Sequence, residues 1–136
     1  MTLEWKHEYE TGSSRIDDEH RVFLDLVREF VEENEDGAEH SVLLRLAHEI
    51  YKYADFHFFS EERMMKRIRY ADLAHHHQVH QHLLEELRLY VESLATDASQ
   101  APTMARFLVR WFTSHTVSED TKLASAIAAH EASRKH

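Results

Sequence analysis

The chain contains only two glycines and one proline in 136 residues, and this scarcity limits the folds that it can adopt. Hairpins and β-sandwiches need many turns built from glycine, proline, asparagine and aspartate. Glycine-rich phosphate-binding loops, dinucleotide-binding folds, propellers and collagen-like repeats are excluded for the same reason. The sequence therefore predicts an all-α protein.

Apolar residues recur at steps of three and four along four segments, which is the spacing of one helix face. Residues with helix-end preferences mark their boundaries. Asp17 or Asp18 can cap the first helix, Gly37 suits a left-handed residue after it, Asp72 can cap the third helix, and Pro102 suits a first helical turn. We expect helices at about 17–36, 41–69, 72–95 and 102–129.

The connections between these segments are short, so consecutive helices should run antiparallel. The sequence thus predicts an antiparallel up-down four-helix bundle, preceded by an irregular N-terminal arm at 1–15. Residues 1–136 are expected to form one domain, because this length suffices for one hydrophobic core. The polar tail from His130 is expected to fray.

Composition narrows the function as well as the fold. The absence of cysteine excludes disulfides, thiolate metal sites, cysteine nucleophiles and iron–sulfur clusters. The net charge of −9, from 25 acidic and 16 basic residues, disfavours nucleic acid and anionic membranes as partners. No apolar stretch approaches the ~18 residues of a membrane span, and no signal peptide is evident, so we expect a cytoplasmic protein.

Histidine is the compositional outlier, with 13 residues. Several polar residues interrupt the apolar stripes, where a buried polar group costs several kcal/mol unless it is satisfied. Two pairs lie four residues apart, which places both donors on one helix face. Each residue alone could be an ordinary core or surface side chain, but together they predict an internal metal site. They are His20, His57, Glu61, His76, His80 and His115.

The other histidines are expected to face solvent or to lie near loops and chain ends. His48, for example, lies about half a turn away from the face of His57. The remaining members of this group are His7, His40, His75, His77, His82, His130 and His136.

Five short segments resemble the hemerythrin family, in particular its bacterial type. They follow the family's order over roughly residues 3–125, and each is weak alone but specific in combination. The segments are Trp5, residues 16–20, residues 57–62, His76-x-x-x-His80 after Tyr70, and residues 111–115 followed by Asp120. The resemblance implies a non-haem di-iron site with an oxo or hydroxo bridge that binds dioxygen reversibly. The implied iron ligands are His20, His57, Glu61, His76, His80, His115 and Asp120.

The resemblance also implies how the two irons share these ligands. Glu61 and Asp120 would bridge them. His76, His80 and His115 would serve one iron, and His20 and His57 the other. Two six-coordinate irons with a solvent-derived bridge would then keep one position open for a small ligand. A donor set rich in imidazole and poor in carboxylate favours reversible binding over oxidation chemistry.

The sequence departs from the family pattern at three places. Glu19 stands where the family often has glutamine, and its side chain is expected to point outward. Ala71 stands where a proline is common, which should alter only a turn. Phe112 occupies the place of an aliphatic residue that lines the oxygen pocket, so we expect it to line that pocket; ordinary core packing is the alternative, and both roles can hold together.

Other functions and metals stay open at this point. The site could belong to a di-iron enzyme with peroxidase, oxidase or nitric-oxide-handling activity. It could also be the oxygen or redox sensor of a longer signalling protein with an output domain. Iron follows from the resemblance alone, because imidazole and carboxylate donors also suit manganese, cobalt or zinc. We expect an oxygen carrier, store or sensor module rather than an enzyme, with dioxygen or another small diatomic molecule as ligand.

Overall fold

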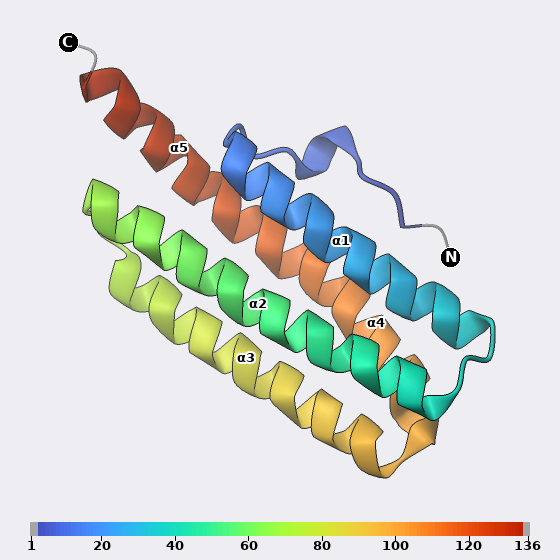
Figure 1. The fold of residues 1–136 in the computed structure, drawn as a ribbon. Helices are drawn as coiled ribbons and strands as arrows, with labels where there is room; N and C mark the ends of the chain where they lie inside the picture. The colour runs from blue at the N-terminus through green and yellow to red at the C-terminus, as the bar shows by residue number, and fades with distance from the viewer. Residues whose placement is uncertain (1–2, 135–136) are drawn as a thin grey trace.

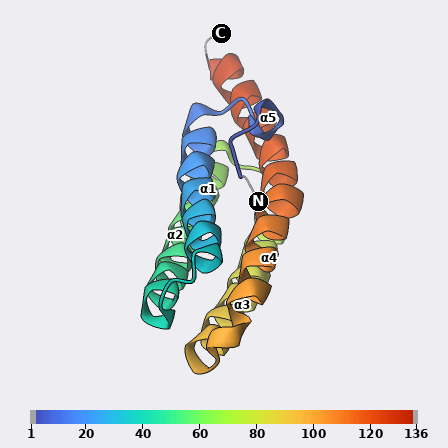
Figure 2. The same cartoon turned by 90° about the vertical axis from the view of Figure 1, so that its right-hand side faces the viewer.

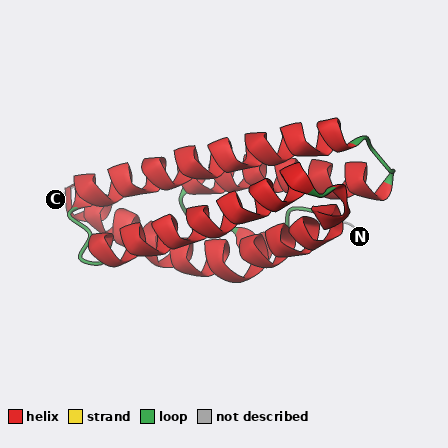
Figure 3. Ribbon diagram, turned by 90° about the horizontal axis from the view of Figure 1, so that it is seen from below, coloured by secondary structure: helices red, strands yellow, loops and turns green. Residues whose placement is uncertain are grey.

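The computed structural model describes residues 3–134, and at positions 115–118 it describes the backbone alone. The chain forms four rods that run antiparallel in turn and lie side by side, as Figure 1 and the view from below in Figure 3 show. No strand occurs among the described residues, so the prediction of an all-α antiparallel bundle is confirmed. The helices are α1 (Ser14–Glu35), α2 (His40–Ile68), α3 (Leu73–Thr96), α4 (Ala101–Trp111) and α5 (Val117–Arg134).

The fourth rod of the bundle consists of α4 and α5 joined by a π-helical turn, Phe112–Thr116. Figure 2 shows α4 and α5 in line with each other. A π-turn adds a residue to a helix and shifts the face on which later side chains lie. Phe112, at the start of the π-turn, and Asp120, beyond it on α5, are both buried.

The start of α1 differs from the expectation. The helix begins at Ser14, and the side chain of Ser13 accepts a hydrogen bond from the backbone N–H of Ile16 at 3.4 Å. The prediction of a cap at Asp17 or Asp18 was therefore wrong. Asp17 is buried and accepts hydrogen bonds from the backbone N–H and the hydroxyl of Thr11, at 2.9 and 2.8 Å. Asp17 therefore links the N-terminal arm to α1 and does not cap the helix.

The other helix ends follow the sequence more closely. Gly37 has a φ of 75°, as expected for the left-handed residue after α1, and Pro102 lies in the first turn of α4. Asp72 occupies the cap position of α3, but its side chain makes no capping hydrogen bond. The expectation that the chain frays from His130 was wrong, because α5 continues to Arg134. None of the described helices combines the length and the apolar character that a membrane crossing requires.

The N-terminal arm packs onto the bundle rather than hanging free. It contains a short 3-10 turn at His7–Tyr9, and Leu3 and Tyr9 are buried. The guanidinium of Arg28 donates a hydrogen bond to the carbonyl of Leu3 at 2.8 Å. The ring of Tyr9 lies edge-on to Phe112 at 5.3 Å, so the arm covers the start of the π-turn.

Two separate apolar clusters form the core. The larger one includes Phe23, Phe58 and Trp111, and the smaller one consists of Ile16, Met65, Leu123 and Ala124. Between them lies a layer of fully buried polar side chains on α1, α2, α3 and α5. Such a layer costs free energy unless its groups are satisfied, so it marks the candidate site.

Candidate metal centre

Three helices bring four buried polar side chains to one point in the bundle. His20 comes from α1, His57 and Glu61 from successive turns of α2, and Asp120 from α5 beyond the π-turn. One ligand atom of each lies within 4.8 Å of the others. All four are at most 2% exposed. The structure thus brings together four of the seven residues that the sequence proposed as ligands.

Asp120 is the acceptor at the centre of this group. Its Oδ2 lies 2.6 Å from Nε2 of His20 and 3.4 Å from Nε2 of His57. The rings of His20 and His57 meet edge to face at 5.0 Å. The Nε2 atoms of both histidines therefore point to the same carboxylate.

Glu61 stands between two groups of histidines. Its Oε1 lies 3.2 Å from Nε2 of His57 on one side and 3.5 Å from Nε2 of His80 on the other. His80 comes from α3, where the ring of His76 lies 6.0 Å from it. His76 and His80 are 2% and 4% exposed, so the buried layer continues across Glu61 to α3.

The backbone of His115 lies in the π-turn, but its side chain is outside the described part of the structure. His115 therefore stays a predicted ligand.

The two carboxylates of the layer repel each other. Burial and the negative charge of Asp120 together raise the pKa of Glu61 well above its ordinary value. Burial also raises the pKa of Asp120, but the neighbouring Glu61, His20 and His57 outweigh it and hold that pKa below its usual range. Burial and the neighbouring carboxylate thus favour the protonated form of Glu61, whereas the surrounding groups favour the ionised form of Asp120.

Burial and neighbouring carboxylates also shift the pKa of His57, in opposite directions. Burial lowers its pKa, but the hydrogen bonds to Asp120 and Glu19 outweigh burial and raise the pKa to about 9. Among the described residues, neither carboxylate oxygen of Glu61 has a hydrogen-bond partner, and Nδ1 of His20 has none either. A bound cation would supply positive charge between the buried carboxylates and would satisfy both of them. The buried residues therefore fit a metal.

Comparison with known proteins agrees with this geometry. The family model described as "Hemerythrin HHE cation binding domain" matches residues 11–127. The chain belongs to the hemerythrin family. It is 27% identical over 121 residues to a bacteriohemerythrin of Clostridium acetobutylicum, which covers 85% of this chain and 94% of the relative. It is 22% identical over 125 residues to a bacteriohemerythrin of Pseudomonas aeruginosa, covering 92% and 81%, and 22% identical over 128 residues to one of Stenotrophomonas maltophilia, covering 94% and 83%.

The resemblance noted from the sequence is thereby confirmed. The matched model names a cation-binding domain, and the buried His/Glu/Asp cluster of this hemerythrin is a metal-binding arrangement. None of the matched names denotes an enzyme, in agreement with the expectation of a binding protein.

Glu19 corrects one expectation. Its side chain was expected to point outward, but it is only 9% exposed and faces His57. It accepts hydrogen bonds from Nδ1 of His57 at 2.8 Å, from the hydroxyl of Ser60 at 2.8 Å and from Nε of Arg15 at 3.2 Å. A carboxylate on Nδ1 fixes the orientation of the ring and leaves Nε2 for the metal. The sequence offered only a weak signal for this role, which was an acidic residue directly before the candidate ligand His20.

Glu62 of α2 plays the equivalent part for His80 of α3 and was missed from the sequence. It accepts a hydrogen bond from Nδ1 of His80 at 3.1 Å and another from His77, whose side chain is 55% exposed. A second carboxylate directly after a candidate ligand, here Glu61, was the signal that could have identified it. Both orienting carboxylates thus come from positions next to ligands.

A very small apolar cavity adjoins the cluster. Its volume is about 10 Å³, and it is lined by Phe23, Ala54, His57, Phe58 and Trp111. A space of this size holds about one water-sized molecule.

Phe112 was predicted to line the oxygen pocket, and the structure places its ring beside His20 and Tyr9 rather than in the lining of this cavity. Its ring lies 6.0 Å from that of His20 and 5.3 Å from that of Tyr9. It is 1% exposed. The core role is thus evident, while a role in the oxygen pocket stays a prediction.

Proposed function

We propose that this hemerythrin binds dioxygen reversibly at a non-haem di-iron centre. The observation that carries the proposal is the position of Glu61, a fully buried carboxylate between His57 and His80. A carboxylate with imidazoles on both sides is arranged to be shared by two metal ions. The proposed ligands are His20, His57, Glu61, His76, His80, His115 and Asp120.

The protein's own residues hold and insulate this centre. Asp120 faces Nε2 of both His20 and His57 and would be the second shared carboxylate. Glu19 and Glu62 hold the outer nitrogens of His57 and His80, so that both rings stay oriented toward Glu61. The two irons, when bound, would supply the electrons and the coordination position that dioxygen requires.

The space beside His57 favours a diatomic ligand over an organic substrate. The cavity of about 10 Å³ is apolar, and the rings of Phe23, Phe58 and Trp111 line it beside His57. Dioxygen or another diatomic molecule is close to a water molecule in size, whereas an organic substrate is larger than this space. This favours a carrier, store or sensor over an oxidase of larger molecules.

Metal analysis and visible spectroscopy test the proposal together. Protein produced in iron-replete cells should contain about two irons per chain, as the donor set predicts. Its visible spectrum should change when air is admitted to the reduced protein and return when oxygen is removed. A single metal per chain, mainly zinc, or a spectrum that does not respond to oxygen would refute the proposal.

The lifetime of the oxygenated form separates the remaining alternatives. A carrier or store should keep its oxygenated spectrum for hours before it oxidises. An enzyme or a sensor that responds by oxidation should lose this spectrum within seconds. The measurement uses the same protein and the same visible band.

A further inference from the structure

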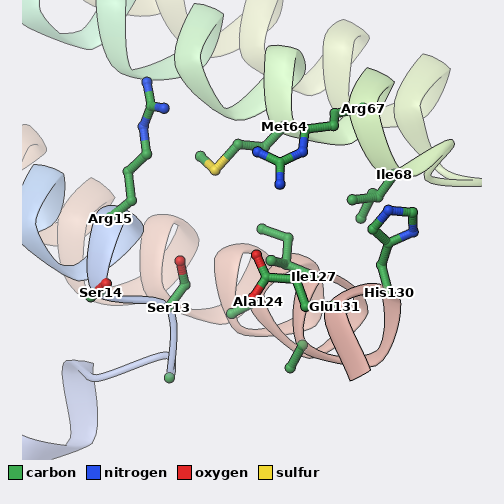
Figure 4. A pocket seen from close by; sticks show the side chains of 12 residues that line it. Ser13, Ser14, Arg15, Met64, Arg67, Ile68, Ala124, Ile127, His130 and Glu131 are labelled. Carbon is green, nitrogen blue, oxygen red and sulfur yellow. The ribbon is translucent and has the colours of Figure 1, made fainter. Parts of the chain in front are cut away.

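A second and larger cavity lies at the end of the bundle where α1 begins and α2 ends. Its volume is about 270 Å³, and Figure 4 shows side chains from α1, α2 and α5 around it. The volume is below the roughly 300–1,000 Å³ of pockets for drug-sized ligands, so its occupant would be smaller. The residues proposed as metal ligands do not line it.

The inner wall of this cavity is apolar. Met64 and Ile68 of α2 face Ala124 and Ile127 of α5 across it. These side chains border the smaller of the two apolar clusters of the core. The wall therefore suits a hydrocarbon group.

Two guanidinium groups border the same cavity. Arg15 of α1 and Arg67 of α2 stand on either side of Met64 in Figure 4. Arg67 makes no hydrogen bond or ion pair with any residue that the structure describes. Arg15 uses Nε to bond Glu19 at 3.2 Å, which holds its side chain and leaves its terminal nitrogens for another acceptor. Guanidinium groups bind carboxylates through paired hydrogen bonds, so both are suited to an anionic head.

The balance of charge around the cavity is unusual for this chain. The whole chain carries a net charge of −9, yet the cavity is lined by two arginines, by His130 and by a single acid, Glu131. Cations at the end of α2 also suit the dipole of that helix, as Lys66 and Arg69 do. Arg67 differs from these two because it lines an apolar hollow that also receives Arg15.

We propose that this cavity binds a small carboxylate with a short hydrocarbon body. The carboxylate bonds Arg15 and Arg67, and the hydrocarbon lies on Met64, Ile68 and Ile127. The Arg15 side chain is already held by Glu19, so less conformational freedom is lost on binding. None of the residues proposed as metal ligands lines this site, although Arg15 also bonds Glu19, which holds His57.

Calorimetric titration of the metal-loaded protein with octanoate tests this proposal. Octanoate should bind saturably at one site per chain. Arg67→Gln should weaken binding by about tenfold or more, which corresponds to the loss of one charge-assisted contact. Ile127→Trp should abolish binding by filling the cavity. Lys66→Gln is the matched control, because Lys66 precedes Arg67 on the same exposed stretch of α2 but does not line the cavity.

Each result of these titrations either supports or overturns the proposed carboxylate site. Binding that is weakened by Arg67→Gln and unchanged by Lys66→Gln supports the site, and circular dichroism shows whether each variant is folded. No saturable binding of octanoate overturns the proposal. Equal weakening by both substitutions reveals a general charge effect and also overturns it. Octanol or inorganic phosphate binding as tightly as octanoate overturns it too, because the proposal requires both the charged head and the hydrocarbon.

Discussion

Phe112 offers the sharpest test of how the arm, the π-turn and the metal layer support one another. It is 1% exposed and starts the π-turn. Its ring lies edge-on to Tyr9 of the arm and stacks near Phe23 of α1 at 6.1 Å. It also lies 6.0 Å from the ring of His20. Phe112→Ala would remove a side chain that contacts the arm, α1 and the metal layer.

The expected loss of stability follows from the buried area. A phenylalanine side chain buries roughly 150–250 Å², which at about 25 cal/mol per Å² amounts to roughly 4–6 kcal/mol. Residual compactness of the unfolded chain reduces this by about 10–40%. We therefore expect Phe112→Ala to lower the free energy of unfolding by about 3–5 kcal/mol, as is usual for buried phenylalanine. The melting temperature should fall by about 10–20 °C.

Urea unfolding followed by far-ultraviolet circular dichroism, at matched metal content, measures this loss. Phe59→Ala is the control, because Phe59 is 71% exposed on α2 and should cost little. Phe112→Leu should lose only about 1–2 kcal/mol and remain folded if the alanine variant does not. The reasoning is refuted if Phe112→Ala costs less than about 1 kcal/mol or no more than Phe59→Ala.

Four further predictions concern the site and one helix end. Removal of metal by a chelator should lower the melting temperature by several degrees, because the buried carboxylates lose their counter-charge; apo and holo proteins that melt within a degree of each other would contradict this. His57→Ala should reduce bound metal, whereas His48→Ala, at an exposed position of the same helix, should not, as metal analysis will show. Glu19→Ala should weaken metal affinity by about 10–100-fold in a chelator competition, and unchanged affinity would argue against its orienting role. Arg69→Gly should stabilise the protein by about 0.5–1 kcal/mol in urea unfolding, because Arg69 has a φ of 55°, and a loss of stability would count against strain there.

Most of the bundle could be predicted from the sequence, because the spacing of apolar residues along a helix is a local property. Inward stripes could be read from spacing alone, and the polar residues within them turned out to be buried: His20, His57, Glu61, His76 and His80. The resemblance to the hemerythrins added Asp120, which lies three residues before Leu123 on the inward face but has no second candidate ligand four residues away. The start of α1 was placed too late because Asp17 resembles a cap by composition, whereas its actual partner is Thr11.

Other features of the site could not be read from periodicity, because they depend on which side chains meet across helices. The inward position of Glu19 depends on His57 and Ser60, which lie on a different helix. The cavity bordered by Arg15 and Arg67 is lined by the start of α1, the end of α2 and the last turns of α5. These three segments are far apart in the chain. Such contacts arise only once the bundle is assembled.

The π-turn links the unusual spacing of the fourth helix to the chemistry of the site. His115 and Asp120 are five residues apart, so in a regular α-helix their side chains would point in clearly different directions. The π-turn at Phe112–Thr116 has a longer repeat, and it brings Asp120 to the face that meets His20 and His57. A π-turn is less stable than regular helix, so it persists only where the surrounding structure favours it. Here the contacts of Phe112 with Tyr9 and Phe23 stabilise its first residue, and the contact of Asp120 with His20 fixes the register beyond it.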